Sequence, residues 1–196
     1  MLLLAVLWLS PLAAWSRTSF APHMLLHVGV VSIAAPLLAL GLAGRVPGPA
    51  TFRSALSWCL LAGFAEFVAV WIWHAPILHD LAARDNFAFA LEQASFLLGS
   101  LGLWLATLAS WRRDTAPAGA IALFLTFAHM SLFGLLLTLA PRLLYDPDLC
   151  AGAFGLDRLD NQHLGGAIML AGGLAPLTGA LVSATRAVRR SDRDAS

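Results

Sequence analysis

The chain is dominated by long apolar runs that contain almost no charged side chains. Of its 196 residues, 59% are hydrophobic and 12% are charged, which is about half the charged fraction of an ordinary soluble domain. Several runs are long enough to cross a bilayer as helices, and they lack the alternation typical of strands. Within lipid, such a segment satisfies its own backbone only as a helix. The sequence therefore predicts an all-α integral membrane protein.

The runs predict a bundle of about six transmembrane helices in one domain, residues 1–188, followed by a short polar tail, residues 189–196. The expected spans are Leu2–Trp15, His23–Leu42, Ala55–Leu78, Phe87–Ser110, a fifth that starts after Pro117 and reaches Ala140, and His163–Val188. The first run is short and has no basic segment ahead of it. It is either a shortened membrane helix or a cleaved signal peptide. Five helices remain if it is removed or incomplete.

Arginine placement sets the expected orientation of the bundle. The loops after the second and fourth spans, together with the C-terminal region from Arg186 onward, carry eight arginines, whereas the opposite loops carry four, diluted by six aspartates. Because basic residues concentrate on the cytoplasmic side, the arginine-rich side and the C-terminus are expected in the cytoplasm. The net charge of +1 indicates no basic face for nucleic acid. The two cysteines are too few for a disulfide framework.

Six histidines interrupt this apolar chain, and five are expected near the extracytoplasmic surface. The five are His23, His27, His74, His79 and His163. His129 lies about halfway through the fifth span. An ionisable side chain at membrane depth marks a functional site by default. The histidines therefore predict a site at the outer ends of the second, third and last spans.

The spacing of His23 and His27 suits a metal ion, because residues at i and i+4 share one helix face about one turn apart. Met130 follows His129, and imidazole with a thioether suits copper(I) better than magnesium or calcium. Other interpretations stay open. His23 can be an interfacial or capping residue, His79 a solvated loop residue, His129 a hydrogen-bonding partner of a neighbouring helix, and Met130 a gap-filler.

Carboxylates and amides near the histidines are candidates for orienting them. Glu66 and Glu92 are the only carboxylates within the predicted spans. Each is expected either to orient an imidazole or to hold helices together. Asp160 and Gln162 flank His163 and are further candidates.

The start of the last span carries architectural signals as well. Asp160 or Asn161 is expected to cap the helix. The pairs Gly165-Gly166 and Gly172-Gly173 should let a neighbouring helix approach closely.

These segments resemble the CtaG-type cytochrome c oxidase assembly factors, a bacterial membrane family found with haem–copper oxidases. The resemblance covers residues 20–185 and rests on several motifs in a fixed order. They are His23-Met24-Leu25-Leu26-His27 with Ala35-Pro36-Leu37-Leu38, then Trp73-His74-Ala75-Pro76, then Leu91-Glu92-Gln93-Ala94-Ser95-Phe96-Leu97, then His129-Met130-Ser131-Leu132-Phe133-Gly134-Leu135-Leu136-Leu137-Thr138, and finally Asn161-Gln162-His163-Leu164-Gly165-Gly166.

The resemblance implies an assembly factor for cytochrome c oxidase in the bacterial inner (plasma) membrane, not an enzyme. It implies binding or delivery of copper, as Cu(I), near the extracytoplasmic face. The candidate ligands are His23, His27, His74, His79, His129, His163 and Met130. The expected partners are oxidase subunits, a periplasmic copper chaperone and membrane lipid, with no nucleic acid.

Two other functions stay open. One is a b-type haem protein that transfers electrons, although His23 and His27 cannot ligate opposite faces of one haem from neighbouring turns. The other is a metal-free scaffold for oxidase subunits.

The chain departs from the family pattern at three places. The family usually has Leu-Glu-His where this chain has Leu91-Glu92-Gln93, and it tends to have tyrosine at the position of His79. Its Asp-Gln-Gln-Leu-Gly-Gly signature corresponds to residues 161–166, with a histidine at His163. Either histidine has moved around one site, so that His79 and His163 compensate for Gln93, or this member has a remodelled site.

Overall fold

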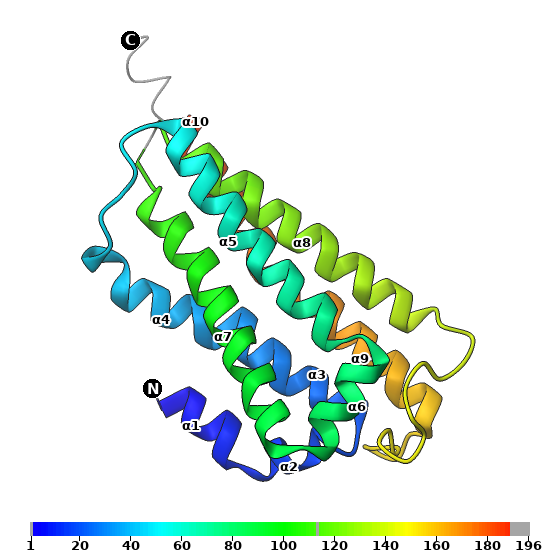
Figure 1. Ribbon diagram of the computed structural model, residues 1–196. Helices are drawn as coiled ribbons and strands as arrows, with labels where there is room; N and C mark the ends of the chain where they lie inside the picture. Colours follow the sequence, from blue (N-terminus) through cyan, green and yellow to red (C-terminus); the bar gives the residue numbers. More distant parts are fainter. Residues whose placement is uncertain (1, 113, 189–196) are drawn as a thin grey trace.

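A computed structural model describes residues 2–112 and 114–188, and its regular structure in those ranges is entirely helical (Figure 1). Five stretches of the described chain are long and apolar enough to cross a membrane. They are Phe20–Arg45, Phe52–Trp73, Asn86–Ala109, Ala116–Thr138 and Arg158–Val188. The prediction of an all-α membrane protein is confirmed. The tail at residues 189–196 lies outside the described residues.

The first predicted span does not cross the bundle. It folds as two short helices, α1 (Leu2–Leu9) and α2 (Pro11–Trp15). With 8 residues, α1 is about 12 Å long, far short of the roughly 30 Å of a bilayer's apolar core. Leu7 is buried against Gly29 of the first membrane span. The segment packs on the side of the bundle without spanning it, which leaves five spans in the described chain.

The first of the five membrane spans, Phe20–Arg45, contains a wide helical turn in its middle. Its parts are α3 (Phe20–Val28), the π-helical η1 (Gly29–Ala34), α4 (Ala35–Leu42) and the short 3₁₀ turn η2 (Ala43–Arg45). Pro36 has no N–H to donate to the preceding turn, so the regular ladder cannot continue unchanged there. The Ser100 hydroxyl on the neighbouring helix donates to the Val31 carbonyl at 2.7 Å. This bond satisfies a backbone group inside the irregular turn.

The next span, α5 (Phe52–Trp73), corresponds to the predicted span Ala55–Leu78 and ends earlier than the sequence predicted. It begins at a capping box between Thr51 and Ser54 and stops at Trp73 instead of Leu78. Pro76 explains the difference, because proline disfavours helical backbone at the preceding residue and is favoured in a helix's first turn. Ala75 is extended, and a separate helix, α6 (Pro76–Arg84), follows. Figure 1 shows α6 leaving the axis of α5.

The remaining spans are α7 (Asn86–Ala109), α8 (Ala116–Thr138), and the pair α9 (Arg158–Gly172) and α10 (Leu174–Val188). The predicted cap of the last span is wrong. Asp157 caps α9 by accepting a hydrogen bond from the Asp160 N–H at 2.9 Å, so the helix starts before His163. Asn161 instead accepts bonds from the Ser19 hydroxyl and the Ala21 N–H. The start of α3 is thereby fixed to α9.

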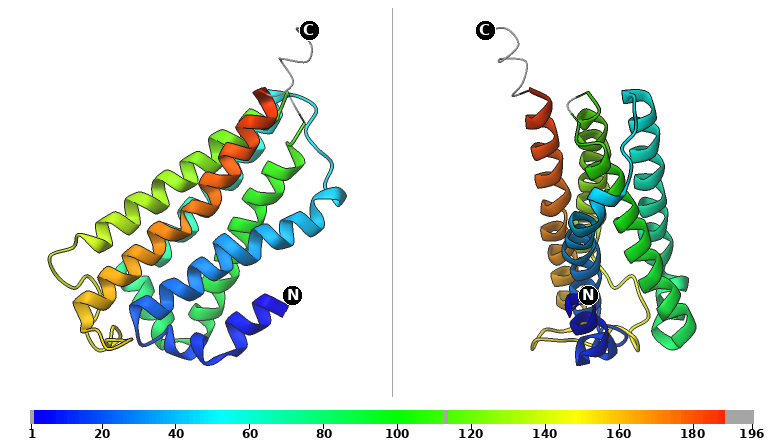
Figure 2. Two further views of the ribbon diagram at one scale, coloured as in Figure 1. Left: turned by 180° about the vertical axis from the view of Figure 1, so that it is seen from behind. Right: turned by 90° about the vertical axis from the view of Figure 1, so that its left-hand side faces the viewer.

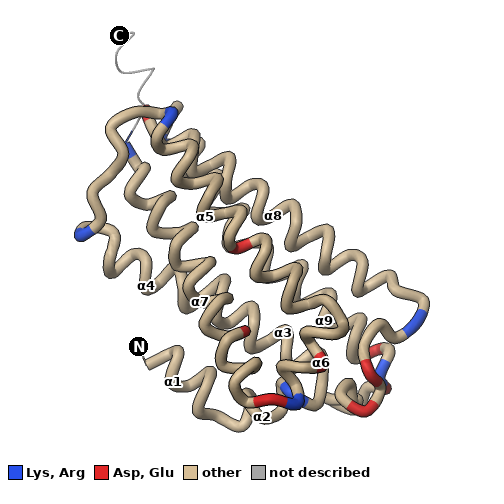
Figure 3. The backbone as a smooth tube through the Cα atoms, in the orientation of Figure 1, with Lys and Arg blue, Asp and Glu red and all other residues tan. Residues whose placement is uncertain are grey.

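The five spans close into a ring (Figures 1 and 2). Helix α5 packs on α7 and α8, and α8 packs on α9 and α10. The first span completes the ring, because α3 packs on α9 and α4 packs on α7. Charged residues gather at the two ends of this bundle (Figure 3). We call the end near Arg45, Arg53, Arg112 and Arg186 the arginine end, and the opposite end, with α2, α6 and the loop 139–157, the histidine end.

Glycines set the contact between α9 and its neighbours. A Cβ on Gly166 would lie 2.7 Å from the Gly134 carbonyl oxygen, and one on Gly165 would lie 2.5 Å from the Phe20 ring. A Cβ on Gly172 would lie 2.7 Å from the Val28 side chain. The predicted close approach of helices at these glycines is confirmed.

Candidate metal centre

Four of the six histidines form a buried cluster at the histidine end. His23 and His27 come from α3, His74 is the C-cap of α5, and His79 comes from α6. None is more than 4% exposed. Their ring centroids lie 4.9 Å apart for His23–His79 and His27–His74, and 5.4 Å apart for His23–His74. Two imidazoles that bind one ion at about 2.0–2.1 Å place their ring centres roughly 5 Å apart, so the spacing suits shared ligation.

The break between α5 and α6 creates this cluster. If α5 had continued through Pro76, His79 would lie further along its axis, away from His23. Because the chain turns at Ala75, the ring of His79 instead comes within contact of the His23 ring. The i, i+4 pair on α3 supplies the other wall, as the sequence predicted.

The backbone fixes the tautomer of His74. Its Nδ1 lies 2.7 Å from the Val70 carbonyl oxygen, and a carbonyl only accepts, so Nδ1 carries the proton. In a neutral ring Nε2 then holds the lone pair, and it has no hydrogen-bond partner among the described residues. A backbone carbonyl on one ring nitrogen is the usual support for a histidine that binds metal through the other.

Other nitrogens of the cluster are also unpaired. Within the described ranges, neither ring nitrogen of His27 has a hydrogen-bond partner, and Nε2 of His23 has none. Buried polar atoms are normally hydrogen-bonded. Several unpaired imidazole nitrogens therefore lie within one buried cluster.

The rings are not yet arranged around one ion. Among residues 2–112 and 114–188, no three His, Cys, Asp or Glu side chains form a group that could hold a metal ion as they stand. The second side-chain torsion of histidine is broad, so the rings can turn without a change in the backbone. Binding by more than two of these histidines therefore requires ring reorientation.

Burial keeps His74 and His79 neutral. Desolvation lowers the pKa of His74 to about 4, and desolvation with the nearby His74 lowers the pKa of His79 to about 3. Both rings are therefore uncharged at pH 7, the form in which imidazole ligates a metal.

Glu92 of α7 supplies the carboxylate of the site. It is fully buried, and its Oε1 lies 3.9 Å from Nε2 of His23. Its Oε2 accepts a hydrogen bond from Gln93 Nε2 at 3.2 Å, and Gln93 Oε1 accepts one from the Trp8 indole at 3.0 Å. Gln93, at the position where the related family usually has histidine, thus connects the N-terminal helix α1 to the carboxylate beside His23.

The loop 139–157 covers the cluster through Tyr145, a residue that the sequence analysis did not single out. The Tyr145 hydroxyl donates to the His74 carbonyl at 3.0 Å. The Tyr145 ring lies 4.4 Å from the ring of His79 and 4.6 Å from that of Phe20. Tyr145 is the chain's single tyrosine, which is the only sequence signal that pointed to it. Cys150 in the same loop is buried, and desolvation raises the pKa of its thiol to about 12.

The structure does not bring His163 into the cluster. Its Nε2 lies 2.9 Å from the Ala140 carbonyl oxygen, and its Nδ1 lies 3.9 Å from Asp160. Gln162 accepts a hydrogen bond from the Leu144 N–H and donates one to the Arg142 carbonyl. These side chains fasten the loop after α8 to the start of α9. Compensation of Gln93 by His163 would require His163 to leave the Ala140 carbonyl.

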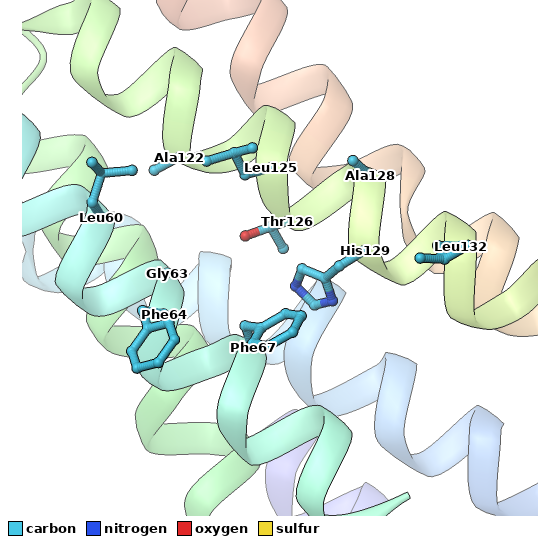
Figure 4. A pocket seen from close by; sticks show the side chains of 10 residues that line it. All are labelled: Leu60, Gly63, Phe64, Phe67, Ala122, Leu125, Thr126, Ala128, His129 and Leu132. Carbon is cyan, nitrogen blue, oxygen red and sulfur yellow. The ribbon is translucent and has the colours of Figure 1, made fainter.

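His129 forms a separate, deeper pair. Its Nε2 lies 2.9 Å from Oε2 of Glu66, which joins α8 to α5. Figure 4 shows His129 pointing from α8 toward Phe67, at one wall of a lateral pocket of about 600 Å³ between these helices. Met130 is fully buried and belongs to the same apolar core as Met24 and Met169.

The pair of Glu66 and His129 is expected to stabilise the bundle without taking part in metal binding. Glu66→Leu or His129→Leu alone leaves one polar group unpaired between α5 and α8, and each should lower the free energy of unfolding by about 1–2 kcal/mol. The double variant should lose less than the sum of the two. Unfolding in mixed detergent micelles, combined in a double-mutant cycle, measures this coupling. Strict additivity would show that the contact contributes nothing.

The chain is similar to one known protein family over almost its whole length. A family model described as "Cytochrome c oxidase caa3 assembly factor (Caa3_CtaG)" matches residues 1–191. Neither the curated proteins nor the solved structures gave a match. The matched range includes all the helices that contribute to the histidine cluster and to the deeper pair.

Proposed function

The chain belongs to the Caa3_CtaG family of cytochrome c oxidase assembly factors, and on that basis we propose that it binds Cu(I) at the histidine cluster and supplies it to the oxidase. Family membership makes the oxidase the partner. The observation that carries the proposal is the convergence of four buried imidazoles from α3, α5 and α6, several of them with unpaired nitrogens.

Copper is the cargo in this proposal. Imidazole nitrogen suits copper, zinc, iron and nickel alike, so the choice of copper comes from the family's role in oxidase assembly. His27 and His74 are the first candidates to hold the ion, because their rings are 4.9 Å apart and both have unpaired nitrogens. His23 and His79 adjoin them. Glu92, buried beside His23, offsets the charge that a cation brings into the site.

The distribution of arginines supports an orientation for the site in the membrane. The arginine end faces the cytoplasm under the positive-inside rule, so the histidine end faces the extracytoplasmic side of the bacterial inner membrane and the C-terminus is cytoplasmic. A periplasmic copper chaperone would then approach at α2, α6 and the loop 139–157. These elements cover the cluster from that side.

Haem binding fits this site poorly. The space beside His23, His79 and Glu92 is too small to admit a water molecule, whereas pockets for small organic ligands begin at roughly 300 Å³. Facing imidazoles that lie 4.9–5.4 Å apart leave no room for a macrocycle between them.

Oxidase purified from a deletion strain tests the proposal. Wild-type protein should restore the copper content of the oxidase, and the variant His27→Ala/His74→Ala should leave most of the oxidase without copper but with its normal haem. His163→Ala is the control and should restore copper as the wild type does. Normal copper with the double variant, at equal protein level, would favour the metal-free scaffold.

A further inference from the structure

A second lateral groove lies toward the arginine end, on the face of the bundle formed by α4, α7 and α10. Its volume is about 450 Å³. The lining side chains are almost all apolar, and they include Pro36, Leu40, Trp104, Leu108, Leu174 and Val182. The groove is distinct from the pocket beside His129 and from the histidine cluster.

The mouth of this groove carries a positioned guanidinium. Arg186, in the last turn of α10, lies over the Trp111 ring at 4.1 Å. Trp111 lines the groove, and its indole N–H donates to the Ser183 hydroxyl at 3.2 Å. The stacked arrangement orders Arg186 while leaving the edge of its guanidinium able to donate hydrogen bonds.

Two more arginines belong to the elements that form the groove. Arg45 ends the first span after α4, and Arg112 follows Trp111 after α7; both are exposed. Arg45 donates one bond to the Gly41 carbonyl at 2.8 Å. Each of the three helices that line the groove therefore reaches the membrane surface at an arginine.

We propose that this groove binds one anionic phospholipid, with an acyl chain between α4, α7 and α10 and the phosphate beside Arg186. The volume accommodates roughly 15 methylene groups, if each takes about the 30 Å³ of a water molecule. The apolar lining matches the chain, and the arginines match the charge of the headgroup. Basic pockets between transmembrane helices on the cytoplasmic side are a known form of lipid recognition.

Two arginines at the opposite end of the bundle already have side-chain partners. At the histidine end, Arg84 pairs with Asp146, and Arg17 donates to Asn86. Arg53 lies at the arginine end but on α5, which does not line the groove. Arg53 therefore offers a matched control that changes the same surface charge at a different helix.

Native mass spectrometry of the full chain in detergent tests the site, with phosphatidylglycerol and phosphatidylcholine of the same acyl chains as probes. Wild-type protein should bind one phosphatidylglycerol in preference to phosphatidylcholine. Arg186→Gln should weaken phosphatidylglycerol binding roughly fivefold and leave phosphatidylcholine unchanged, whereas Arg53→Gln should alter neither. Ala175→Phe, which narrows the groove, should weaken both lipids.

Three results would overturn the proposal. They are equal binding of the two lipids by the wild type, equal losses in Arg186→Gln and Arg53→Gln, and unchanged binding in Ala175→Phe. Arg186→Lys keeps the charge and should retain most of the preference. Together with the unfolding temperature of each variant, the Arg186→Lys substitution separates loss of a headgroup contact from loss of folding. The test needs no copper and stands apart from the function proposed above.

Discussion

Replacing His27 and His74 with alanine is expected to weaken Cu(I) binding by at least about a hundredfold. Residues that merely orient a metal ligand through a hydrogen bond already contribute about 10–100-fold to metal affinity. These two rings are placed to be ligands themselves. Their centroids are 4.9 Å apart, and Nε2 of His74 is held in its lone-pair form by the Val70 carbonyl. Anaerobic titration of the purified protein against a competing coloured Cu(I) chelator measures the affinity.

The matched control for this experiment is His163→Ala. His163 is also a histidine at the histidine end, but its Nε2 is occupied by the Ala140 carbonyl. Its removal should leave the affinity for Cu(I) nearly unchanged. A loss in His163→Ala equal to that in the double variant would mean that the ligands lie at the start of α9. Retention of tight binding by both would refute copper binding at the cluster.

The membrane fold was predictable from the sequence because hydropathy acts over whole spans. The ends of those spans depend on single residues and were less predictable. Pro76 alone moves the end of α5 to Trp73 and converts the expected last turn into α6. Asp157 starts α9 before His163 because its carboxylate reaches the Asp160 N–H. Helix caps and helix breaks depend on individual side chains, and a hydropathy pattern does not resolve them.

Part of the candidate site also followed from sequence spacing. The i, i+4 relation of His23 and His27 is intrinsic to one helix, so their common face was predictable. The meeting of His79 with His23 was not, because it depends on the turn at Ala75 and on the packing of α6. The contact of Tyr145 with His74 joins residues 71 positions apart, and no local pattern predicts such a bond.

The contrast between His79 and His163 bears on the departures from the family pattern. Both were candidates to replace the histidine missing at Gln93. In the structure His79 joins the cluster, whereas His163 bonds to the loop after α8. Gln93 itself accepts a hydrogen bond from the Trp8 indole N–H and donates one to Glu92. We expect this member to use α1 as a support for Glu92, so that the carboxylate beside His23 is held without a histidine at that position.

The glycines of α9 decide whether the helices that carry the cluster stay together. Gly166→Ala is expected to lower the free energy of unfolding by about 3 kcal/mol. The added Cβ would lie 2.6 Å from the Thr138 backbone nitrogen and 2.7 Å from the Gly134 carbonyl oxygen. Both are backbone atoms, so relief requires α8 and α9 to separate. Unfolding in mixed detergent micelles, followed by circular dichroism, measures the change.

Gly102→Ala on α7 provides the control, because a Cβ there meets nothing within 4 Å. Alanine is the better helix former by about 1 kcal/mol, so this substitution should be neutral or stabilising. The opposite signs of the two stability changes separate the effect of packing from that of helix propensity. Equal stabilities of the two variants would refute the close contact between α8 and α9. Since α9 also holds Phe20 and the start of α3, Gly166→Ala should weaken Cu(I) binding while every histidine is still present.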